Sequence, residues 1–299
     1  MNNPATQYGE NKLTGLIKDY LQLIKPSLTI MVVFSSVICY LLAPHIFFNL
    51  KMIVLLFVGG FLVTGSANTI NQVVEKDTDA LMKRTSSRPI ASQRMSVIHG
   101  WAFAIITGML GVFILGFFFN WLAAGLAAFG LFLYAFIYTP LKKINSMAVL
   151  MGALPGALPC LIGWVAGTNE LSTGGWVLFG MQFIWQFPHF WAIAWVAHKD
   201  YSAAGFKLLP SEAGPTKFTA LQTIVYSALM IPIGLMPFFI GMSGMVSLGI
   251  VFIANLFMVL QAVRLYKEMD VKAARRVMFS SYIYLPIVFF ALLADKIVM

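Results

Sequence analysis

Long apolar segments alternate with short polar connections along almost the whole length of this 299-residue chain. A helix needs about 20 predominantly apolar residues to cross the hydrocarbon core of a bilayer. The pattern therefore predicts an all-α polytopic membrane protein, in which a polar arm at residues 1–27 precedes a single domain, a bundle of nine transmembrane helices, at residues 28–299. The expected spans are residues 28–48, 52–74, 97–119, 121–138, 147–167, 174–197, 218–239, 245–264 and 277–295.

The composition excludes a soluble globular domain, because 60% of the residues are hydrophobic, 10% are charged and the mean hydropathy is +0.83. The first apolar segment has full spanning length and follows a polar arm, so it is not expected to be a cleavable signal peptide. Cys39 and Cys160 both fall in apolar segments, and two isolated cysteines predict neither a disulfide framework nor a metal cluster.

The basic residues lie almost entirely on one side of the expected bundle. Lys51 and Lys296 fall on the other side. The positive-inside rule then places the N-terminus and the basic loops in the cytoplasm and the C-terminus outside, as nine spans require. The net charge of +9 alone could suggest that the chain binds nucleic acid, but this one-sided distribution of the bases argues against it. The bases on the cytoplasmic side are Lys12, Lys18, Lys25, Lys76, Lys83, Arg84, Arg88, Arg94, Lys142, Lys143, Lys199, Lys207, Lys217, Arg264, Lys267, Lys272, Arg275 and Arg276.

A polar run at residues 71–88 ends the second expected span. Asn71, Glu75 and Asp79 recur at every fourth position, so a helix would place them on one face. Oxygen ligands without Cys or His favour a hard ion, and Mg²⁺ commonly bridges carboxylates to substrate phosphates. Because the bases Lys83, Arg84 and Arg88 follow at once, the run suggests a diphosphate site. The alternative is an ordinary loop in which acids balance bases.

The sixth expected span also carries polar groups. Pro188 should kink this helix and free backbone carbonyls. Gln186 and His189 lie beside it within the span. His189 is open to two interpretations: an imidazole that bonds a neighbouring helix, or one that contacts a bound ligand. Between the fourth and fifth spans, Pro140 should end the helix, and the lysines after it could serve only as topology anchors.

These motifs, in this order, resemble the UbiA-type intramembrane prenyltransferases, and the resemblance covers roughly residues 20–295. The first motif of that superfamily has the form N-(D/Q)-x-x-(D/E)-x-x-x-D, which here is Asn71 to Asp79. The branch that the chain resembles is the heme O synthases. The features that suggest this branch are Asp77, Met82-Lys83-Arg84-Thr85 running to Arg88-Pro89, Tyr138-Thr139-Pro140-Leu141-Lys142, Gly156-Ala157-Leu158-Pro159 with Gly163-Trp164, and Trp185-Gln186-x-Pro188-His189-Phe190.

The chain departs from the superfamily in one place. The aromatic prenyltransferases usually carry a second cluster, D-x-x-x-D, after the sixth helix. Here Asp200 is the single acid between Glu170 and Glu212. This argues against a quinone-precursor enzyme and leaves a second Mg²⁺ without paired aspartates. Lys199 and Lys207 could neutralise phosphate there instead.

The resemblance implies an Mg²⁺-dependent transfer of a farnesyl group from farnesyl diphosphate to a vinyl group of heme B, with addition of water, in a bacterial inner membrane. The expected partners are membrane lipid and, as candidates, heme-handling or terminal oxidase assembly proteins. The alternatives are a UbiA-type enzyme acting on an aromatic or quinone precursor, a non-catalytic heme assembly factor and a transporter. The residues expected in the site are Asn71, Glu75, Asp79 and Tyr138 for catalysis, Asn71, Glu75, Asp77 and Asp79 for the metal, and Arg84, Arg88, Lys142, Lys199, Lys207, Asp200, Gln186 and His189 for substrate.

Overall fold

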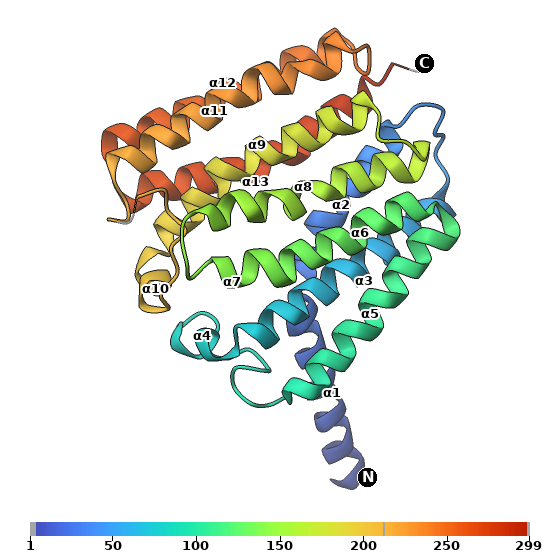
Figure 1. Cartoon of the computed structure of the whole chain (residues 1–299), viewed down its shortest axis with the longest axis vertical. Coiled ribbons are helices and arrows are strands. Elements are labelled where there is room, and N and C mark those ends of the chain that lie inside the picture. Colours follow the sequence, from blue (N-terminus) through green and yellow to red (C-terminus); the bar gives the residue numbers. More distant parts are fainter. Residues whose placement is uncertain (1–3, 212, 298–299) are drawn as a thin grey trace.

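The computed structural model describes residues 4–211 and 213–297, with side chains from residue 14 onward. This part of the chain is helical, and its only extended pairing is one isolated bridge between Ser243 and Lys296. The all-α prediction is confirmed. The helices (Figure 1) are α1 (Pro4–Ile24), α2 (Pro26–Leu42), α3 (Leu50–Val74), α4 (Lys76–Leu81), α5 (Val97–Phe118), α6 (Trp121–Phe132), the π-helix η1 (Leu133–Tyr138), α7 (Thr139–Leu141), α8 (Met147–Thr168), α9 (Thr173–Val196), α10 (His198–Ala203), α11 (Lys217–Phe239), α12 (Met245–Glu268) and α13 (Val271–Ala294).

The expected count of nine spans is too high when the described helices are judged by length and hydropathy. Seven are long and apolar enough to cross a membrane, with α6, η1 and α7 together forming one of them. An eighth results if Thr14–Ile24 and Pro26–Leu42, which meet at a bend of 46°, form one broken span. The chain is therefore a multi-pass membrane protein with seven or eight such segments.

The expected span that does not pass this test is α9, which has 24 residues but is less apolar than the helices that pass. Gln182, Gln186 and His189 lie along it and are buried inside the bundle. A helix that is surrounded by protein need not present an apolar surface to lipid, because its polar groups can bond neighbouring helices. The hydropathy of α9 is accordingly low, although the helix lies alongside α8 and α13 (Figure 1).

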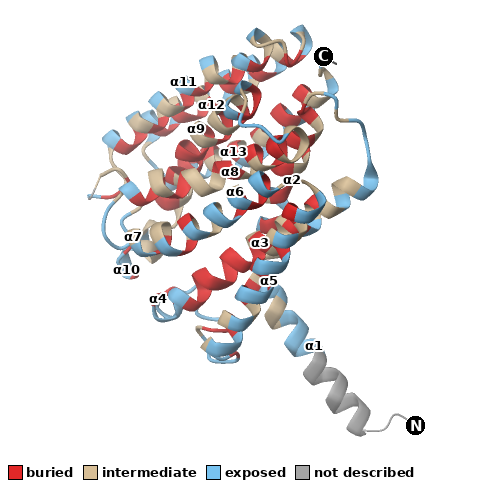
Figure 2. Ribbon diagram, turned by 45° about the vertical axis from the view of Figure 1, so that its right-hand side comes forward, coloured by how far each residue is buried: buried red, intermediate tan, exposed pale blue. Residues whose placement is uncertain are grey.

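The helices pack through their small residues and leave large apolar side chains on the periphery. Gly163 of α8 lies so close to α2 that a Cβ atom built on it would stand 1.9 Å from the Ser36 carbonyl oxygen. Gly111 of α5 meets the backbone of α3 in the same way. Buried positions face the interior of the bundle, while exposed positions line its outside (Figure 2). This arrangement suits a bundle whose solvent is lipid.

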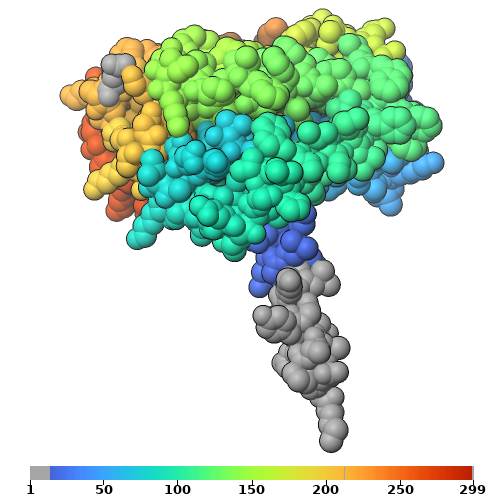
Figure 3. Space-filling model, turned by 60° about the horizontal axis from the view of Figure 1, so that its bottom comes forward, coloured from blue at the N-terminus to red at the C-terminus, as the bar shows by residue number. Residues whose placement is uncertain are grey.

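The short helices gather at one end of the bundle. Figure 1 shows α4, α7 and α10 together there, with α1 at the same end, whereas α13 runs to the opposite end. The segment after α3 and the segment after α9 touch through a small apolar cluster of Met82, Ala204 and Phe206. In Figure 3 these two segments, cyan and gold, lie side by side. The polar residues of interest therefore lie at one end of the bundle.

Candidate active site

The three polar residues of the first motif lie on one face, although the helix is interrupted between them. Helix α3 ends at Val74 and α4 begins at Lys76, yet the backbone hydrogen bonds continue through Glu75. The Glu75 amide donates to the Asn71 carbonyl at 2.9 Å, and the Asp79 amide donates to the Glu75 carbonyl at 2.7 Å. Asn71, Glu75 and Asp79 are 3%, 6% and 0% exposed, so their oxygens are almost wholly removed from water.

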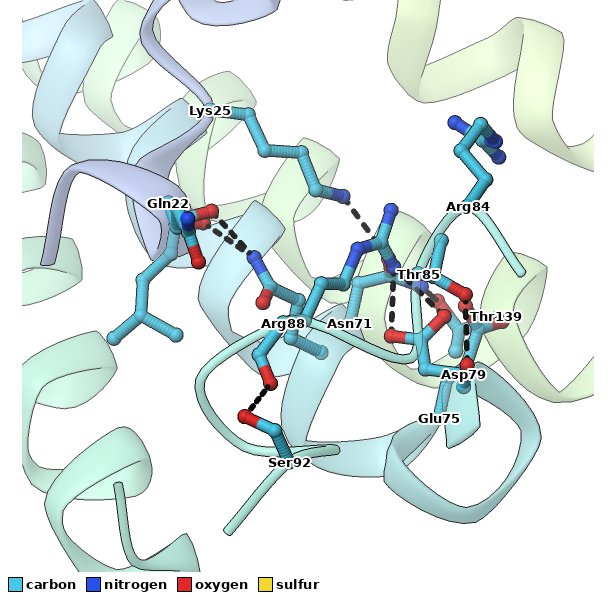
Figure 4. Close-up of polar contacts among 12 residues, drawn as sticks. Gln22, Lys25, Asn71, Glu75, Asp79, Arg84, Thr85, Arg88, Ser92 and Thr139 are labelled. Atoms are coloured by element: carbon cyan, nitrogen blue, oxygen red, sulfur yellow. Dashed lines mark hydrogen bonds and ion pairs between the residues drawn. The ribbon is translucent and has the colours of Figure 1, made fainter. Parts of the chain in front are cut away.

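Asp79 is held by Arg88. One guanidinium nitrogen, Nη1, donates to both carboxylate oxygens, at 2.8 and 2.7 Å (Figure 4). The turn between these residues is fixed by Thr85, whose hydroxyl donates to the Asp79 carbonyl at 2.9 Å. A buried carboxylate is costly unless it is paired, and this arrangement provides both the charge and the hydrogen bonds.

Glu75 is held by Lys142, which comes from the segment between α7 and α8. The Lys142 ammonium lies 2.5 Å from Oε1 of Glu75, a buried oxygen that has no other partner of good hydrogen-bond geometry among the described residues. The same ammonium lies 4.7 Å from the ring centroid of Tyr138 and 5.3 Å from that of Phe206. Lys142 is 7% exposed, so the aromatic faces and the carboxylate replace its water.

Asn71 is held by a residue that was not expected in the site, Lys25. The Lys25 ammonium donates to Oδ1 of Asn71 at 3.3 Å, and Nδ2 of Asn71 donates to the Thr139 hydroxyl at 3.4 Å. Lys25 stands in the left-handed region (φ 50°) at the break between α1 and α2, which turns it toward the cluster. In Figure 4 its side chain points to Asn71 and Arg88. The signal in the sequence that could have identified Lys25 is its position directly before Pro26, at the start of an expected span.

Tyr138 lies in the π-helix η1, next to this cluster. Its ring lies 5.3 Å from that of Tyr134, and Gly152 of α8 leaves room for it, because a Cβ there would approach the ring to 2.7 Å. π-Helical turns are rare and often occur at functional sites. The turn ends at Tyr138, and the next residue, Thr139, accepts a hydrogen bond from Asn71.

Gln186 and His189 lie deeper, between α9 and its neighbours. The Gln186 amide donates to the Ala153 carbonyl of α8 at 3.0 Å. Nδ1 of His189 lies 2.8 Å from the Ser281 hydroxyl, which itself donates to the Met278 carbonyl at 2.6 Å. The His189 ring stacks on Trp185 and meets the edge of Tyr282. The hydrogen bond from His189 on α9 to Ser281 on α13 supports the structural interpretation of His189. This bond uses Nδ1 and does not involve Nε2.

The remaining expected residues lie outside the buried cluster. Asp77 is exposed on α4, and Lys199 is exposed on α10 beside the half-buried Asp200. Arg84 is exposed and extends away from Asp79 toward α10, where it lies 3.5 Å from the Tyr201 hydroxyl (Figure 4). The exposed Lys207 lines a separate pocket of about 270 Å³, and its backbone amide donates to the Lys142 carbonyl at 2.8 Å.

The donor set at the cluster suits a hard divalent cation, provided that a substrate completes the coordination. Among the described residues, no three His, Cys, Asp or Glu side chains gather closely enough to hold a metal ion. The available ligands are the carboxylates of Glu75 and Asp79 and the amide oxygen of Asn71. A cation that keeps few protein ligands and takes the rest from phosphate is typical of Mg²⁺.

The fold and the site together define an intramembrane helical bundle with a buried cluster of acids and bases at one end. The model of the UbiA prenyltransferase family matches residues 32–291, and the chain belongs to this family. A protoheme IX farnesyltransferase of Cytophaga hutchinsonii is 45% identical over 282 residues, which are 93% of this chain and 97% of that protein. The protein of the same name from Flavobacterium johnsoniae is 39% identical over 291 residues, covering 95% and 96% of the two chains.

Solved structures show the same fold. A structure of digeranylgeranylglyceryl phosphate synthase matches with a TM-score of 0.78 at 20% identity, covering 93% of this chain and 98% of that chain. A UbiA homolog from Archaeoglobus fulgidus bound to GPP and Mg²⁺ matches with a TM-score of 0.70 at 17% identity, covering 92% and 99%. At these identities the likeness establishes the fold alone.

Proposed function

We propose that this chain transfers a farnesyl group from farnesyl diphosphate to a vinyl group of heme B and adds water, giving heme O. The observation that carries the proposal is the 45% identity, along nearly the whole of both chains, to a protein named protoheme IX farnesyltransferase. The buried cluster of Asn71, Glu75 and Asp79 with Lys25, Arg88 and Lys142 supports a reaction that creates an anionic leaving group.

The bases of the cluster would stabilise the departing diphosphate. Breaking the bond between the farnesyl C1 and its oxygen leaves the electron pair on the diphosphate and a positive charge on the allylic group. Arg88 presents planar donors that match phosphate oxygens, while Lys142 and Lys25 provide point charges. A preorganised donor at a developing charge contributes about 3–4 kcal/mol in a site shielded from water.

Magnesium fits this site through Glu75, Asp79 and Asn71, and when bound it supplies a Lewis acid that neutralises charge on the leaving diphosphate. The bases of the cluster fix the diphosphate end of the substrate at the polar mouth of the bundle. The apolar interior then excludes water from the allylic cation until it meets the vinyl carbon of the heme. Water adds to the second cation, beside the porphyrin, and a proton leaves as the hydroxyl forms.

His189 would contact the porphyrin. It lies within the bundle, between aromatic side chains, and its hydrogen bond to Ser281 uses Nδ1. A neutral imidazole with Nε2 to spare is a suitable partner for heme iron. Tyr138, between Lys142 and Tyr134, would line the path of the allylic group.

We also propose that the end carrying α4, α7 and α10 faces the cytoplasm of a bacterial cell, with the end of α13 outside. This orientation counts the bent pair of α1 and α2 as one span and α9 as another. The excess of Lys and Arg at that end supports this orientation. Heme-handling and terminal oxidase assembly proteins would be partners, because heme B must reach the site and heme O must leave it.

A competition between acceptors tests the reaction. Purified protein is given labelled farnesyl diphosphate with heme B, with an aromatic quinone precursor, or with both. The proposal predicts that label appears in heme even when the aromatic acceptor is in excess. Label in the aromatic compound alone would assign the chain to another branch, and label in neither would favour a heme carrier or transporter.

A further inference from the structure

Each carboxylate of the candidate active site is already paired with a base. Arg88 takes both oxygens of Asp79, and Lys142 takes Glu75. Lys25 takes the amide oxygen of Asn71, so Asn71, Glu75 and Asp79 are each engaged by a base. Lys25 is also within electrostatic range of Glu75, Asp79, Arg88 and Lys142, which makes these groups one coupled unit.

A divalent cation that arrives alone must break these ion pairs. To reach Asp79 it has to displace Arg88, and to reach Oε1 of Glu75 it has to displace Lys142. Lys142 is 7% exposed, so the displaced ammonium would remain buried beside a cation of the same sign. Removing one partner of a buried ion pair is strongly unfavourable, because the charge left behind is uncompensated.

An isoprenyl diphosphate meets the opposite situation. The cluster holds three basic side chains, Lys25, Arg88 and Lys142, beside two carboxylates, so an anion meets several hydrogen-bond donors there. A diphosphate that draws Arg88 and Lys142 to itself uncovers the oxygens of Asp79 and Glu75 at the same time. The anion thus creates the ligands that a cation needs, and the cation compensates the carboxylates that the bases have left.

We propose that Arg88 and Lys142 act as exchangeable partners, which release Asp79 and Glu75 only when a diphosphate is present, so that divalent cation and diphosphate bind as a coupled pair with the anion first. This inference deepens the proposed function and rests on its diphosphate substrate, though not on heme. Linkage requires the effect to be reciprocal, and coupling between sites is typically about 5-fold to 150-fold in affinity.

Metal binding without diphosphate tests the exchange directly. Mn²⁺ is titrated into the detergent-solubilised wild-type protein, and the free ion is counted by its electron paramagnetic resonance signal. We expect no saturable binding of Mn²⁺ alone to the wild type. Lys142→Gln frees Glu75 and should therefore bind Mn²⁺ alone at least about fivefold more tightly than the wild type does. Saturable binding to the wild type as tight as to this variant overturns the proposal.

Two further variants separate the exchange from general effects. Arg94→Gln removes a base of the same loop that pairs with Asp19 on the surface, and it should behave as the wild type. Glu75→Gln/Lys142→Gln replaces the buried ion pair by two amides and should lose the metal site gained by the single variant. If Lys142→Gln does not fold, the wild-type titration still decides, because tight binding of Mn²⁺ alone contradicts the exchange.

A second titration separates failure of the exchange from failure of the proposed function. Farnesyl thiolodiphosphate, a slowly reacting analogue, is titrated into the wild type with Mg²⁺ and with EDTA. We expect measurable binding in both, tighter with Mg²⁺ by about 5-fold to 150-fold. Absence of binding under both conditions would contradict the diphosphate substrate itself. Equal affinity with and without Mg²⁺ would contradict the coupling but leave the substrate in place.

Discussion

At the residue scale, the site depends on pairs whose members come from distant parts of the chain. Lys25 and Asn71 are 46 positions apart, and Asn71 and Thr139 are 68 positions apart. The spacing of Asn71, Glu75 and Asp79 places them on one face without knowledge of the fold. Arg88 lies nine positions after Asp79 and belongs to the same run. Lys25 and Lys142 reach the cluster only through the way in which α1, α3 and α7 meet, so no periodicity of the sequence pairs them with Asn71 and Glu75.

Glu75→Gln should lower turnover by about 100-fold or more, the size expected when one group that stabilises developing charge is lost. The substitution removes a carboxylate ligand for the cation and leaves Lys142 beside a neutral amide, so the melting temperature should also fall. Turnover and melting are measured together on purified protein. Glu268→Gln, which breaks an exposed pair with Arg276, is the control, and equal losses in both variants would contradict the assignment.

His189 and Ser281 provide a test that separates the two interpretations of the histidine. Ser281→Ala removes the hydrogen bond of the Ser281 hydroxyl to His189 but keeps the imidazole, and it should cost about 1 kcal/mol of stability. If His189 contacts heme through Nε2, His189→Ala loses heme affinity and Ser281→Ala retains most of it. Heme titration and melting of the apo protein are compared for both variants. Heme affinity that is unchanged in both would leave His189 with a structural role only.

At the element scale, the glycines and prolines of α8 determine how its neighbours approach. Pro155 and Pro159 lie inside α8, and the Gln186 and Gln182 amides of α9 donate to the carbonyls of Ala153 and Gly156. These buried bonds explain why α9 is polar for a membrane helix. The sequence predicted a span at residues 174–197 but could not show that the polar face of this helix is covered by protein.

Gly163→Ala should destabilise the bundle by about 1–3 kcal/mol, because the added methyl group would meet the Ser36 carbonyl of α2 and overpack the contact. Gly125→Ala in α6 is the matched control, since nothing lies within 4 Å of its Cβ position. There the change should be neutral or stabilising by up to about 1 kcal/mol, from helix propensity alone. Thermal melting in detergent measures both, and equal effects would contradict the close packing.

At the scale of the whole molecule, the distribution of bases and the end at which the short helices gather agree. The number of spans is the part that the sequence does not settle, because α1 and α2 form a bent pair and α9 is sheltered by its neighbours. The side on which each loop lies depends on the path of the chain rather than on hydropathy alone.

Single cysteines at positions 83, 143 and 272 should be protected from an impermeant thiol reagent in intact cells, whereas a cysteine at position 51 should react. The three protected positions lie in the basic loops, and Lys51 lies at the start of α3 on the opposite side. The native Cys39 and Cys160 are buried and give a low background. Labelling of the three loop positions from outside would reverse the orientation.

The central claim is that the chain farnesylates heme with addition of water, and product analysis in labelled water tests it most directly. Purified protein, heme B, farnesyl diphosphate and Mg²⁺ are incubated in ordinary water and in ¹⁸O-enriched water, and the heme is analysed by mass spectrometry. The account predicts a heme that has gained one farnesyl group and one hydroxyl group, with ¹⁸O in that hydroxyl and one diphosphate released per product. Unmodified heme, or a prenylated heme without oxygen from water, would contradict it.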